Sequence, residues 1–247
     1  MGLNLRGADA VVTGASSGIG AAVAHRLAAR GCRVVLVGRD RQRLQRAADG
    51  CAGAPLCADV TEDTGFRAVA AAASRADVLV HCAGAGFAGD FAAMPPDRVA
   101  ALTELDLTAP LRLTRAALPG MLQRGRGHLV FISSVAALGV PDEEVYSAAK
   151  AGLRTFAAAV DRRCARGGVS VTTVLPGAVR TPFFAGRGRA YDRRFPRMVE
   201  PEAVATAAVR AVERGRREVF VPRWLVVADR VRGAAPRLYQ WLAGEFG

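Results

Sequence analysis

A glycine-rich turn between a strand-like run and a helical pattern constrains this chain more than any other feature. The run DAVVTG (residues 9–14) is short and apolar, as in a buried strand, and TGASSGIG (13–20) stands at its end. The stretch GIGAAVAHRLAARG (18–31) then has the apolar spacing of a helix and ends in glycine. The sequence therefore predicts a strand, a tight turn and a helix in direct succession.

The residues of this turn suit a bound nucleotide. Gly14, Gly18 and Gly20 allow a tight turn and a close approach of backbone to a pyrophosphate, and the helix start offers free N–H groups. Ser16 and Ser17 add hydroxyl donors. An ordinary strand-to-helix turn would also use glycine, but the strand–helix units that follow favour nucleotide binding.

Strand-like and helical segments alternate along the rest of the chain. Further apolar runs occupy 33–38, 54–60, 77–84, 127–134, 169–177 and 218–221. The longest helical patterns span 96–123 and 145–166, and the alanine-rich helix within 61–75 is predicted to start at Thr61. Buried strands that alternate with helices indicate a parallel sheet covered on both faces, with ligands beyond the carboxyl ends of its strands.

Composition narrows the class of protein. The chain has 247 residues, 51% of them apolar, and no linker divides it, so we expect one large α/β domain over 1–247. The net charge is +12, but arginines are scattered among acidic residues and aromatics are only 6%, which favours a solvated surface over nucleic-acid binding.

Cysteine usage and hydropathy bear on the compartment. The five cysteines form no CxxC pair and their number is odd, which predicts a reduced cytoplasmic protein without structural zinc. The first 20 residues hold the glycine turn in place of a signal peptide, and no 18-residue apolar run could span a bilayer. We expect a soluble protein with no metal site.

The segment VYSAAKAG (145–152) contains the only lysine of the chain, Lys150, four residues after Tyr146. On a helix, this spacing places both side chains on one face. A nearby cation lowers the pKa of a phenol from about 10, so the pair suits acid/base work on an alcohol or carbonyl. Lysine also hydrogen-bonds hydroxyls and exchanges protons, which arginine does poorly. A chance surface pair is the less favoured interpretation.

Five ordered motifs give the chain a resemblance to a known family. They are TGASSGIG, HCAG (81–84), ISS (132–134), Tyr146-x-x-x-Lys150 and PGAVRTP (176–182). Their order and spacing over about residues 5–222 resemble those of short-chain dehydrogenases/reductases. The resemblance implies a Rossmann-like, doubly wound sheet of seven parallel strands in the order 3-2-1-4-5-6-7. It also implies hydride transfer between a nicotinamide cofactor and an alcohol or carbonyl carbon.

The resemblance assigns the catalytic roles. Tyr146 would be the acid/base, with Lys150 lowering its pKa and holding the cofactor ribose. A serine, the second of a pair, would hold the substrate oxygen, usually 13 residues before the tyrosine. Ser134 is 12 residues before it and Ser133 is 13 before it. Alignment on ISSV implies a one-residue deletion in the following loop and favours Ser134, with Ser133 as the fallback.

The same comparison implies a cofactor-binding set. Asp59 and Val60 match the adenine position, and the residues from Pro176 to Thr181 match the nicotinamide position. The full set is Gly14, Ser16, Ser17, Gly18, Ile19, Gly20, Arg39, Asp59, Val60, Cys82, Ala83, Gly84, Tyr146, Lys150, Pro176, Gly177, Val179 and Thr181.

The end of the second strand predicts which nicotinamide cofactor is used. NAD-preferring relatives have an acidic residue there, which binds the ribose hydroxyls. This chain has Gly38 followed by Arg39, whose planar fork suits a 2′-phosphate, so we predict NADP(H). The charged residues Asp40, Arg41 and Arg43 follow closely in sequence and also affect the electrostatic potential at this position.

Two positions depart from the family pattern. His81 and Cys82 stand where Asn-Asn is common, and we expect the lone His81 to be hydrogen-bonded packing rather than a ligand. Asp106 occupies the place of an asparagine whose backbone carbonyl helps hold a relay water in relatives. Its carboxylate could shift the titration of Lys150, and Asp106 stays outside the predicted catalytic set.

The sequence gives the least information about the substrate and the partners. The stretch 183–199 occupies the place of the substrate loop, and its aromatics and arginines indicate either an apolar pocket with a basic mouth or a mobile surface loop. The first suits a lipophilic ketone or alcohol, or a carbonyl on an anionic carrier. The helical extension 223–247 could cap the pocket, join a dimer or lie on a membrane surface.

Two functions follow from these observations. The leading one is an NADP-dependent carbonyl reductase or alcohol dehydrogenase. The alternative is a dinucleotide-binding regulatory or scaffold protein of the same fold without turnover. The resemblance further implies a homodimer or homotetramer built on the helices near 96–123 and 145–166.

Overall fold

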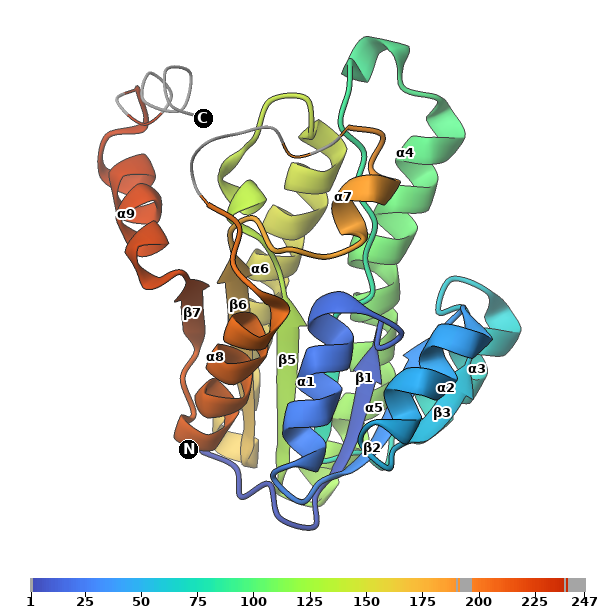
Figure 1. Cartoon of the computed structure of the whole chain (residues 1–247). Helices are drawn as coiled ribbons and strands as arrows, with labels where there is room; N and C mark the ends of the chain where they lie inside the picture. Colours follow the sequence, from blue (N-terminus) through green and yellow to red (C-terminus); the bar gives the residue numbers. More distant parts are fainter. Residues whose placement is uncertain (1, 190, 192–196, 238, 240–247) are drawn as a thin grey trace.

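Seven parallel strands form one sheet in the order β3-β2-β1-β4-β5-β6-β7 (Figure 1). The structure is a computed structural model that describes residues 2–189, 191, 197–237 and 239. The strands are β1 (Asp9–Thr13), β2 (Arg33–Gly38), β3 (Ala54–Cys57), β4 (Val78–His81), β5 (Gly127–Ile132), β6 (Val169–Pro176) and β7 (Glu218–Val221). The predicted doubly wound α/β fold and its strand order are confirmed.

Helices cover both faces of the sheet. They are α1 (Gly18–Ala28), α2 (Arg41–Asp49), α3 (Asp63–Ala73), α4 (Pro96–Thr103), α5 (Ala109–Gln123), α6 (Glu144–Cys164), α7 (Phe183–Gly186), α8 (Pro201–Arg214) and α9 (Val226–Ala234). Helices α1, α2 and α8 share one apolar core with the sheet, and α3, α5 and α6 share the other. Figure 1 shows α1 and α8 side by side in front of the strands.

Alternation along each strand divides the apolar residues between these two cores. In β1, Val12 belongs to the core under α1 and α8, whereas Val11 belongs to the core under α3, α5 and α6. In β5, Val130 and Phe131 divide in the same way. Successive side chains of a strand point to opposite faces, so a strand buried on both faces is apolar throughout. This is the physical reason for the continuous apolar runs in the sequence.

The long helix predicted over 96–123 is interrupted. A π-helical turn, Glu104–Thr108, joins α4 to α5, and the N–H of Ala109 bonds to the carbonyl of Glu104. Pro110 follows directly, and proline has no N–H to donate to the carbonyl four residues earlier, which is that of Asp106. The lost bond loosens the helical ladder at this point, and the wider turn carries Asp106 into the interior.

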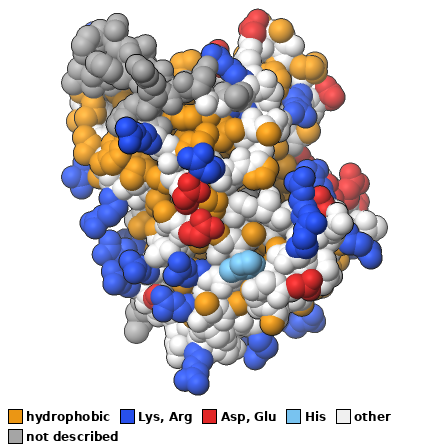
Figure 2. All heavy atoms as spheres, viewed as in Figure 1, with side chains coloured by type: hydrophobic (Ala, Val, Ile, Leu, Met, Phe, Trp, Pro, Cys, Tyr) orange, Lys and Arg blue, Asp and Glu red, His pale blue; other side chains and the backbone are white. Residues whose placement is uncertain are grey.

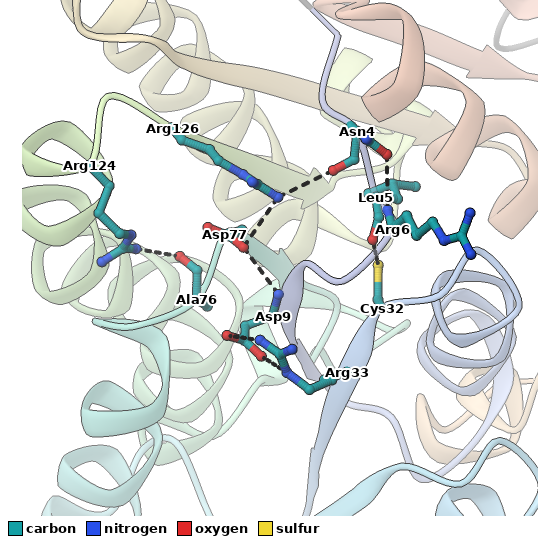
Figure 3. A network of polar contacts seen from close by, with 10 residues as sticks. All are labelled: Asn4, Leu5, Arg6, Asp9, Cys32, Arg33, Ala76, Asp77, Arg124 and Arg126. Carbon is teal, nitrogen blue, oxygen red and sulfur yellow. Dashed lines mark hydrogen bonds and ion pairs between the residues drawn. The ribbon is translucent and has the colours of Figure 1, made fainter.

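A polar network closes the sheet at the amino ends of its strands (Figure 3). The carboxylate of Asp9 accepts two bonds from Arg33, at 2.7 and 2.8 Å, and the carboxylate of Asp77 accepts from the Asp9 N–H at 3.2 Å. Arg126 lies 3.5 Å from the same Asp77 oxygen and donates to the Asn4 carbonyl. These charged contacts lie at the amino ends of the strands, opposite the carboxyl ends, where ligands bind in sheets of this kind.

The extension beyond β7 is helical in its described part and is held by one arginine of α6. After the 3-10 turn Arg223–Leu225, α9 runs to Ala234, and residues 238 and 240–247 lie outside the described part. Arg154 donates to Glu218 on β7 at 2.7 and 2.8 Å and to Asp229 on α9 at 2.6 and 2.9 Å. This double pairing fixes α9 to the body of the protein.

The surface carries its charges in dispersed form. On the face drawn in Figure 2, basic side chains are spread along both sides with acidic ones among them, and apolar side chains gather near α9. Trp224 and Val227 belong to the exposed large apolar residues, with 43% and 57% of their surface accessible. No helix among the described residues is long and apolar enough to cross a membrane.

Candidate active site

A cavity of about 380 Å³ lies at the carboxyl ends of the strands. Its wall comes from the glycine turn after β1, the ends of β2 and β4 to β6, helix α6 and the segment around α7. The predicted site residues that line it are Gly14, Ser16, Ser17, Gly18, Ile19, Gly20, Arg39, Asp59, Val60, Cys82, Ala83, Gly84, Ser134, Tyr146, Lys150, Pro176, Gly177, Val179 and Thr181. The fold thus brings every residue of the predicted set to one cavity.

The glycine turn packs closely against the backbone after β4 and at the start of α1. Gly14 has a φ of +67°, and a Cβ there would lie 2.7 Å from the backbone of Ala83. A Cβ on Gly20 would lie 2.2 Å from the Gly14 carbonyl oxygen. Ser17, at the helix N-cap, makes no capping bond with its side chain, so the first N–H groups face the cavity without an internal acceptor from that residue. This cradle fits a pyrophosphate.

Arg39 directly follows β2 and lines the same cavity as the glycine turn. Its side chain is 70% exposed, and its Nη1 lies 3.3 Å from Asp59 Oδ2. A Cβ at Gly38 would lie 3.1 Å from Ser16, so the packing disfavours a larger side chain at that position. Asp40 is occupied as the cap of α2, where it accepts from the Arg43 N–H at 2.9 Å. Arg39 is therefore the basic side chain at the predicted phosphate position that lines the cavity.

Tyr146, Lys150 and Ser134 meet in the deeper half of the cavity. All three are buried, and Ser134 lies close enough to the Tyr146 hydroxyl to lower its pKa. The Ser134 hydroxyl accepts from the Ala136 N–H at 3.0 Å. Ser133 instead donates to the backbone carbonyl of Lys150 at 2.9 Å. Ser134 is therefore the serine next to Tyr146, whereas the bond of Ser133 connects the end of β5 to α6.

The pKa of Tyr146 differs from the sequence-based expectation. Burial raises it to about 12 although Lys150 lowers it, and the charges of Asp106 and Glu143 raise it further. The lysine therefore acts in the predicted direction, but the prediction that it brings the phenol toward neutral pH is wrong for this structure. The cause is the removal of the phenol from water, which disfavours its charged form.

Asp106 forms an ion pair with Lys150. The Lys150 Nζ lies 2.9 Å from Asp106 Oδ1, and neither side chain is more than 6% exposed. Burial, the largest single cause, lowers the pKa of Lys150, but Asp106, Tyr146 and Cys82 together outweigh it, and the net pKa of Lys150 is raised. The expected influence of Asp106 on the titration of Lys150 is therefore present in the structure.

His81 packs in the interior beneath the cavity. Its ring stacks on Phe131 with centroids 4.7 Å apart, and its Nε2 lies 3.0 Å from the Thr114 hydroxyl. Burial lowers the pKa of His81 to about 3, which keeps the ring neutral. Its predicted role as hydrogen-bonded packing agrees with these contacts.

The described part of segment 183–199 lies over Tyr146. The ring centroid of Phe183 is 5.3 Å from that of Tyr146, Phe184 is 5.6 Å from Phe183, and Tyr191 is 5.1 Å from Phe184. An aromatic wall thus extends from Tyr146 to the rim of the cavity. Residues 190 and 192–196 lie outside the described part.

Two arginines of this segment are ion-paired at the mouth of the cavity. Arg187 is ion-paired with Glu143 and lies over the Phe184 ring at 4.7 Å, and Arg189 pairs with Asp142 at 3.2 Å. These acidic residues come from the loop before α6, which the sequence does not connect to the arginines. Their charges offset those of Arg187 and Arg189. The other arginines of the predicted basic mouth include Arg193 and Arg194, which lie outside the described residues, so the basic mouth stays a prediction.

Comparison with family models decides the class of this chain. Residues 8–192 match the model described as short chain dehydrogenase. This is a short-chain dehydrogenase.

Relatives of this short-chain dehydrogenase cover nearly its whole length. An uncharacterized oxidoreductase from Myxococcus xanthus is 34% identical over 92% of each chain. A solved short-chain dehydrogenase from Sphingobium yanoikuyae in complex with NADPH is 30% identical, with a TM-score of 0.82 over 93% of this chain and 95% of that one. The bulky-bulky ketone specific alcohol dehydrogenase from Comamonas testosteroni is 27% identical, with a TM-score of 0.77 over 93% and 94%.

Sequence reasoning missed several residues that line the cavity of this short-chain dehydrogenase. Glu143 and Val140 come from the shortened loop before α6, and Leu105 comes from the π-helical turn. Glu143 carried one usable signal, because it lies three residues before Tyr146 on a segment that must approach the site. Its pairing with Arg187 joins residues 44 positions apart, and no local pattern encodes it.

Proposed function

We propose that this protein is an NADP(H)-dependent oxidoreductase that acts on the carbonyl or alcohol carbon of an uncharged, lipophilic substrate. One observation carries the proposal. A single cavity joins the glycine turn and Arg39 at one end to Tyr146 and Ser134 at the other. A dinucleotide is long enough to connect two such ends, with its phosphates at the helix start and its nicotinamide near the phenol.

The residues present fit a nicotinamide dinucleotide. A Cβ on Gly14 or Gly20 would collide with the protein's own backbone, so these glycines permit the tight turn before α1, and the N-terminus of α1 favours negative charge. Asp59 and Val60 would meet the adenine, and the segment from Pro176 to Thr181 would meet the nicotinamide. The solved relative from Sphingobium yanoikuyae, with NADPH bound, supports this assignment.

Arg39 supports NADP(H) over NAD(H). Its guanidinium is largely exposed, and its exposed contact with Asp59 at 3.3 Å is of the kind that stabilises weakly. A 2′-phosphate offers Arg39 a doubly charged acceptor, and the glycine at position 38 adds no carboxylate against it. Cys57 donates to the backbone carbonyl of Arg39 at 3.4 Å and supports the strand end at which the arginine begins.

The chain supplies the proton in carbonyl reduction. The reduced nicotinamide, when bound, supplies a hydride to the carbonyl carbon and is oxidised in doing so. The Tyr146 hydroxyl gives its proton to the carbonyl oxygen, and the tyrosine is then re-protonated from water. Ser134 holds the same oxygen by a hydrogen bond, and Lys150 stabilises the phenolate left behind. Alcohol oxidation reverses each step.

The wall of the cavity supports an uncharged, apolar substrate. Phe183, Phe184 and Tyr191 form the side next to Tyr146. The two arginines at the rim are paired with Glu143 and Asp142, so an anionic carrier would compete with these carboxylates. The relative from Comamonas testosteroni is named for bulky ketones, which agrees with such a wall.

A second function has a specific observation in its favour. Lys150 is held by Asp106, and the pKa of Tyr146 is raised to about 12, so the phenol is a weak base near neutral pH. A dinucleotide-binding protein without turnover is consistent with this state. Carbonyl reduction is also consistent with it, because reduction needs the protonated phenol.

Turnover with a panel of substrates separates the two functions. NADPH oxidation would be followed with aromatic, aliphatic and carboxylated ketones, and NADP⁺ reduction with the matching alcohols. We expect turnover with uncharged bulky ketones and little with carboxylated ones. Tight NADPH binding without turnover of any compound would favour the regulatory or scaffold function. Assembly as a homodimer or homotetramer stays a prediction, and light scattering that gives a mass near 25.8 kDa would contradict it.

A further inference from the structure

Asp106 occupies a buried position between the Lys150 ammonium, with which it forms an ion pair, and one backbone N–H that it accepts from. Its Oδ1 lies 2.9 Å from Lys150 Nζ, and its Oδ2 accepts from the Ala85 N–H at 3.2 Å. A carboxylate offers two acceptor oxygens, whereas the amide of an asparagine offers one and carries two donors. An asparagine here could serve only one of these donors and would direct its own NH₂ toward the other. The site is therefore fitted to an acid.

The surroundings of the ion pair confirm that it has little freedom. A Cβ on Gly84 would lie 2.6 Å from Asp106 Oδ1 and 3.4 Å from Lys150 Nζ, so the glycine gives the pair its space. The Lys150 ammonium also donates to the Ile132 carbonyl at 3.3 Å and lies 5.5 Å from the centroid of the Tyr146 ring. The lysine is thus held between β5 and the π-helical turn, next to the catalytic phenol.

The negative charge of Asp106 raises the pKa of Tyr146, whereas the positive charge of Lys150 lowers it. The titratable groups around Lys150 are Asp106 from the π-helical turn, Tyr146 from α6, and His81 and Cys82 at the end of β4. Burial keeps His81 neutral, and it raises the pKa of Cys82 to about 12, so this thiol is also neutral near pH 7. Burial raises the pKa of Asp106, whereas the Lys150 ammonium and the Ala85 N–H lower it, and the 2.9 Å contact with the ammonium is that of an ionised pair in which Asp106 carries the negative charge. Glu143 is a second negative charge that raises the pKa of Tyr146.

We propose that Asp106 is a positioning residue that anchors the Lys150 ammonium and offsets its charge at Tyr146, keeping Tyr146 protonated for donation to a carbonyl oxygen. The inference rests on the proposed function and adds a direction to it. In the favoured direction the carbon receives the hydride, the O–H bond of Tyr146 breaks, and the proton joins the substrate oxygen. Alcohol oxidation needs the phenolate and is disfavoured until the pH is strongly alkaline.

The ionisation of Tyr146 tests this without any substrate. The chain has three tyrosines, so Tyr191→Phe with Tyr239→Phe leaves Tyr146 as the sole tyrosine. In ¹³C-tyrosine-labelled protein, the Cζ resonance then follows this one phenol through a pH titration, while circular dichroism checks the fold at each pH. In Asp106→Asn we expect the midpoint to fall by about one pH unit or more.

A matched control removes a buried charge from the helix that carries Tyr146. Asp161 lies on α6 and, like Asp106, is buried; it pairs with Arg217 at 2.8 Å, and Asp161→Asn should leave the Tyr146 midpoint in place. A midpoint that does not fall in Asp106→Asn, or that falls equally in the control, would overturn the proposal.

A double variant keeps the test decisive if Asp106→Asn does not fold. Asp106→Leu with Lys150→Met replaces both charges by apolar groups, an exchange that buried ion pairs often tolerate. If the charges offset one another, its Tyr146 midpoint should lie close to that of the parent, whereas Lys150→Met alone should raise it. A midpoint in the double variant as high as in Lys150→Met would show that Asp106 has no such effect.

Turnover adds a separate readout. With the best ketone from the panel, the alkaline limb of kcat/KM for reduction should move to lower pH in Asp106→Asn by the same amount as the resonance. Absence of turnover in the parent would count against the proposed function alone. If the parent protein turns over a ketone but the titration midpoint of Tyr146 is the same in the parent and in Asp106→Asn, the result would count against this inference alone.

Discussion

The ring of Phe183 packs against the ring of Tyr146, with centroids 5.3 Å apart and planes inclined by 49°. We propose that through this contact Phe183 both shapes the substrate wall and helps to bury Tyr146. Burial is the largest cause of the raised pKa of Tyr146.

Removal of the Phe183 ring should weaken the binding of bulky apolar ketones. An aromatic contact contributes about 0.5–1.5 kcal/mol beyond its area, so Phe183→Ala should raise KM for an aromatic ketone roughly two- to tenfold. Small aliphatic ketones should be affected less. Phe91, which is 52% exposed on another loop, offers the control Phe91→Ala. Equal losses for large and small ketones would argue against a substrate wall at Phe183.

The catalytic pair should respond to two conservative changes. Tyr146→Phe keeps the ring against Phe183 and removes the proton donor, so kcat should fall by several orders of magnitude while NADPH still binds. Lys150→Arg keeps a positive charge, but a guanidinium does not reproduce the compact contact of the ammonium with Asp106. Turnover in Lys150→Arg should therefore be much lower than in the parent. Steady-state kinetics and NADPH fluorescence titration measure both effects. Full turnover in either variant would contradict the mechanism.

Arg39 should set the choice between NADPH and NADH. A charge-assisted hydrogen bond contributes roughly 1.5–3 kcal/mol, so Arg39→Ala should cost about ten- to a hundredfold in kcat/KM with NADPH and little with NADH. Arg46→Ala, on the exposed side of α2, removes the same charge away from the cavity and should leave the preference unchanged. A parent that prefers NADH would show that the interpretation of Arg39 is wrong.

Two buried histidines should make the fold sensitive to acid. Burial lowers the pKa of His81 to about 3 and that of His128 to about 4, below the unfolded value of 6.5. The unfolded chain therefore binds more protons between these values, and stability is lost as the pH falls from about 6.5 toward about 4. The loss for one such group is on the order of 3 kcal/mol. His128→Gln should flatten this decline in urea unfolding measured over that pH range, and an unchanged slope would speak against it.

The pairing of Arg154 should hold the C-terminal extension in place. Arg154→Ala removes four charge-assisted bonds to Glu218 and Asp229 and should cost about 2 kcal/mol of local stability at α9. Hydrogen exchange should then rise in α9 while β4 and β5 stay protected. Arg162→Ala, an exposed position on the same helix, is the control. Unchanged exchange in α9 would mean that other contacts hold it.

Much of the fold and the membership of the site followed from local patterns. The glycine turn, the apolar runs and the Tyr146–Lys150 spacing each depend on neighbouring residues, and local sterics and burial decide them. Parallel strands bring their carboxyl ends to one edge, so residues such as Arg39 and Thr181 line one cavity although they are far apart in sequence.

The features that the sequence did not reveal depend on long-range contacts. Thr61 was expected to start a helix, but its hydroxyl bonds to Asp59, and α3 begins at Asp63. The offset charge of Arg187 and the fully buried state of Asp106 arise from side chains that approach only after the chain has folded. Burial also determines the sign of the Tyr146 shift, and a motif alone cannot give the burial of a particular hydroxyl.

The single lysine of the chain lines the cavity and is 4% exposed. Every other basic side chain of the Lys/Arg type is arginine, which does not react with amine-reactive reagents. Acetylating or cross-linking chemistry aimed at lysine therefore has one side-chain target in this sequence, and that target is buried and paired with Asp106. The rate at which a small amine-reactive reagent labels Lys150 thus reports how readily the reagent reaches this cavity and how readily the ammonium loses its proton there.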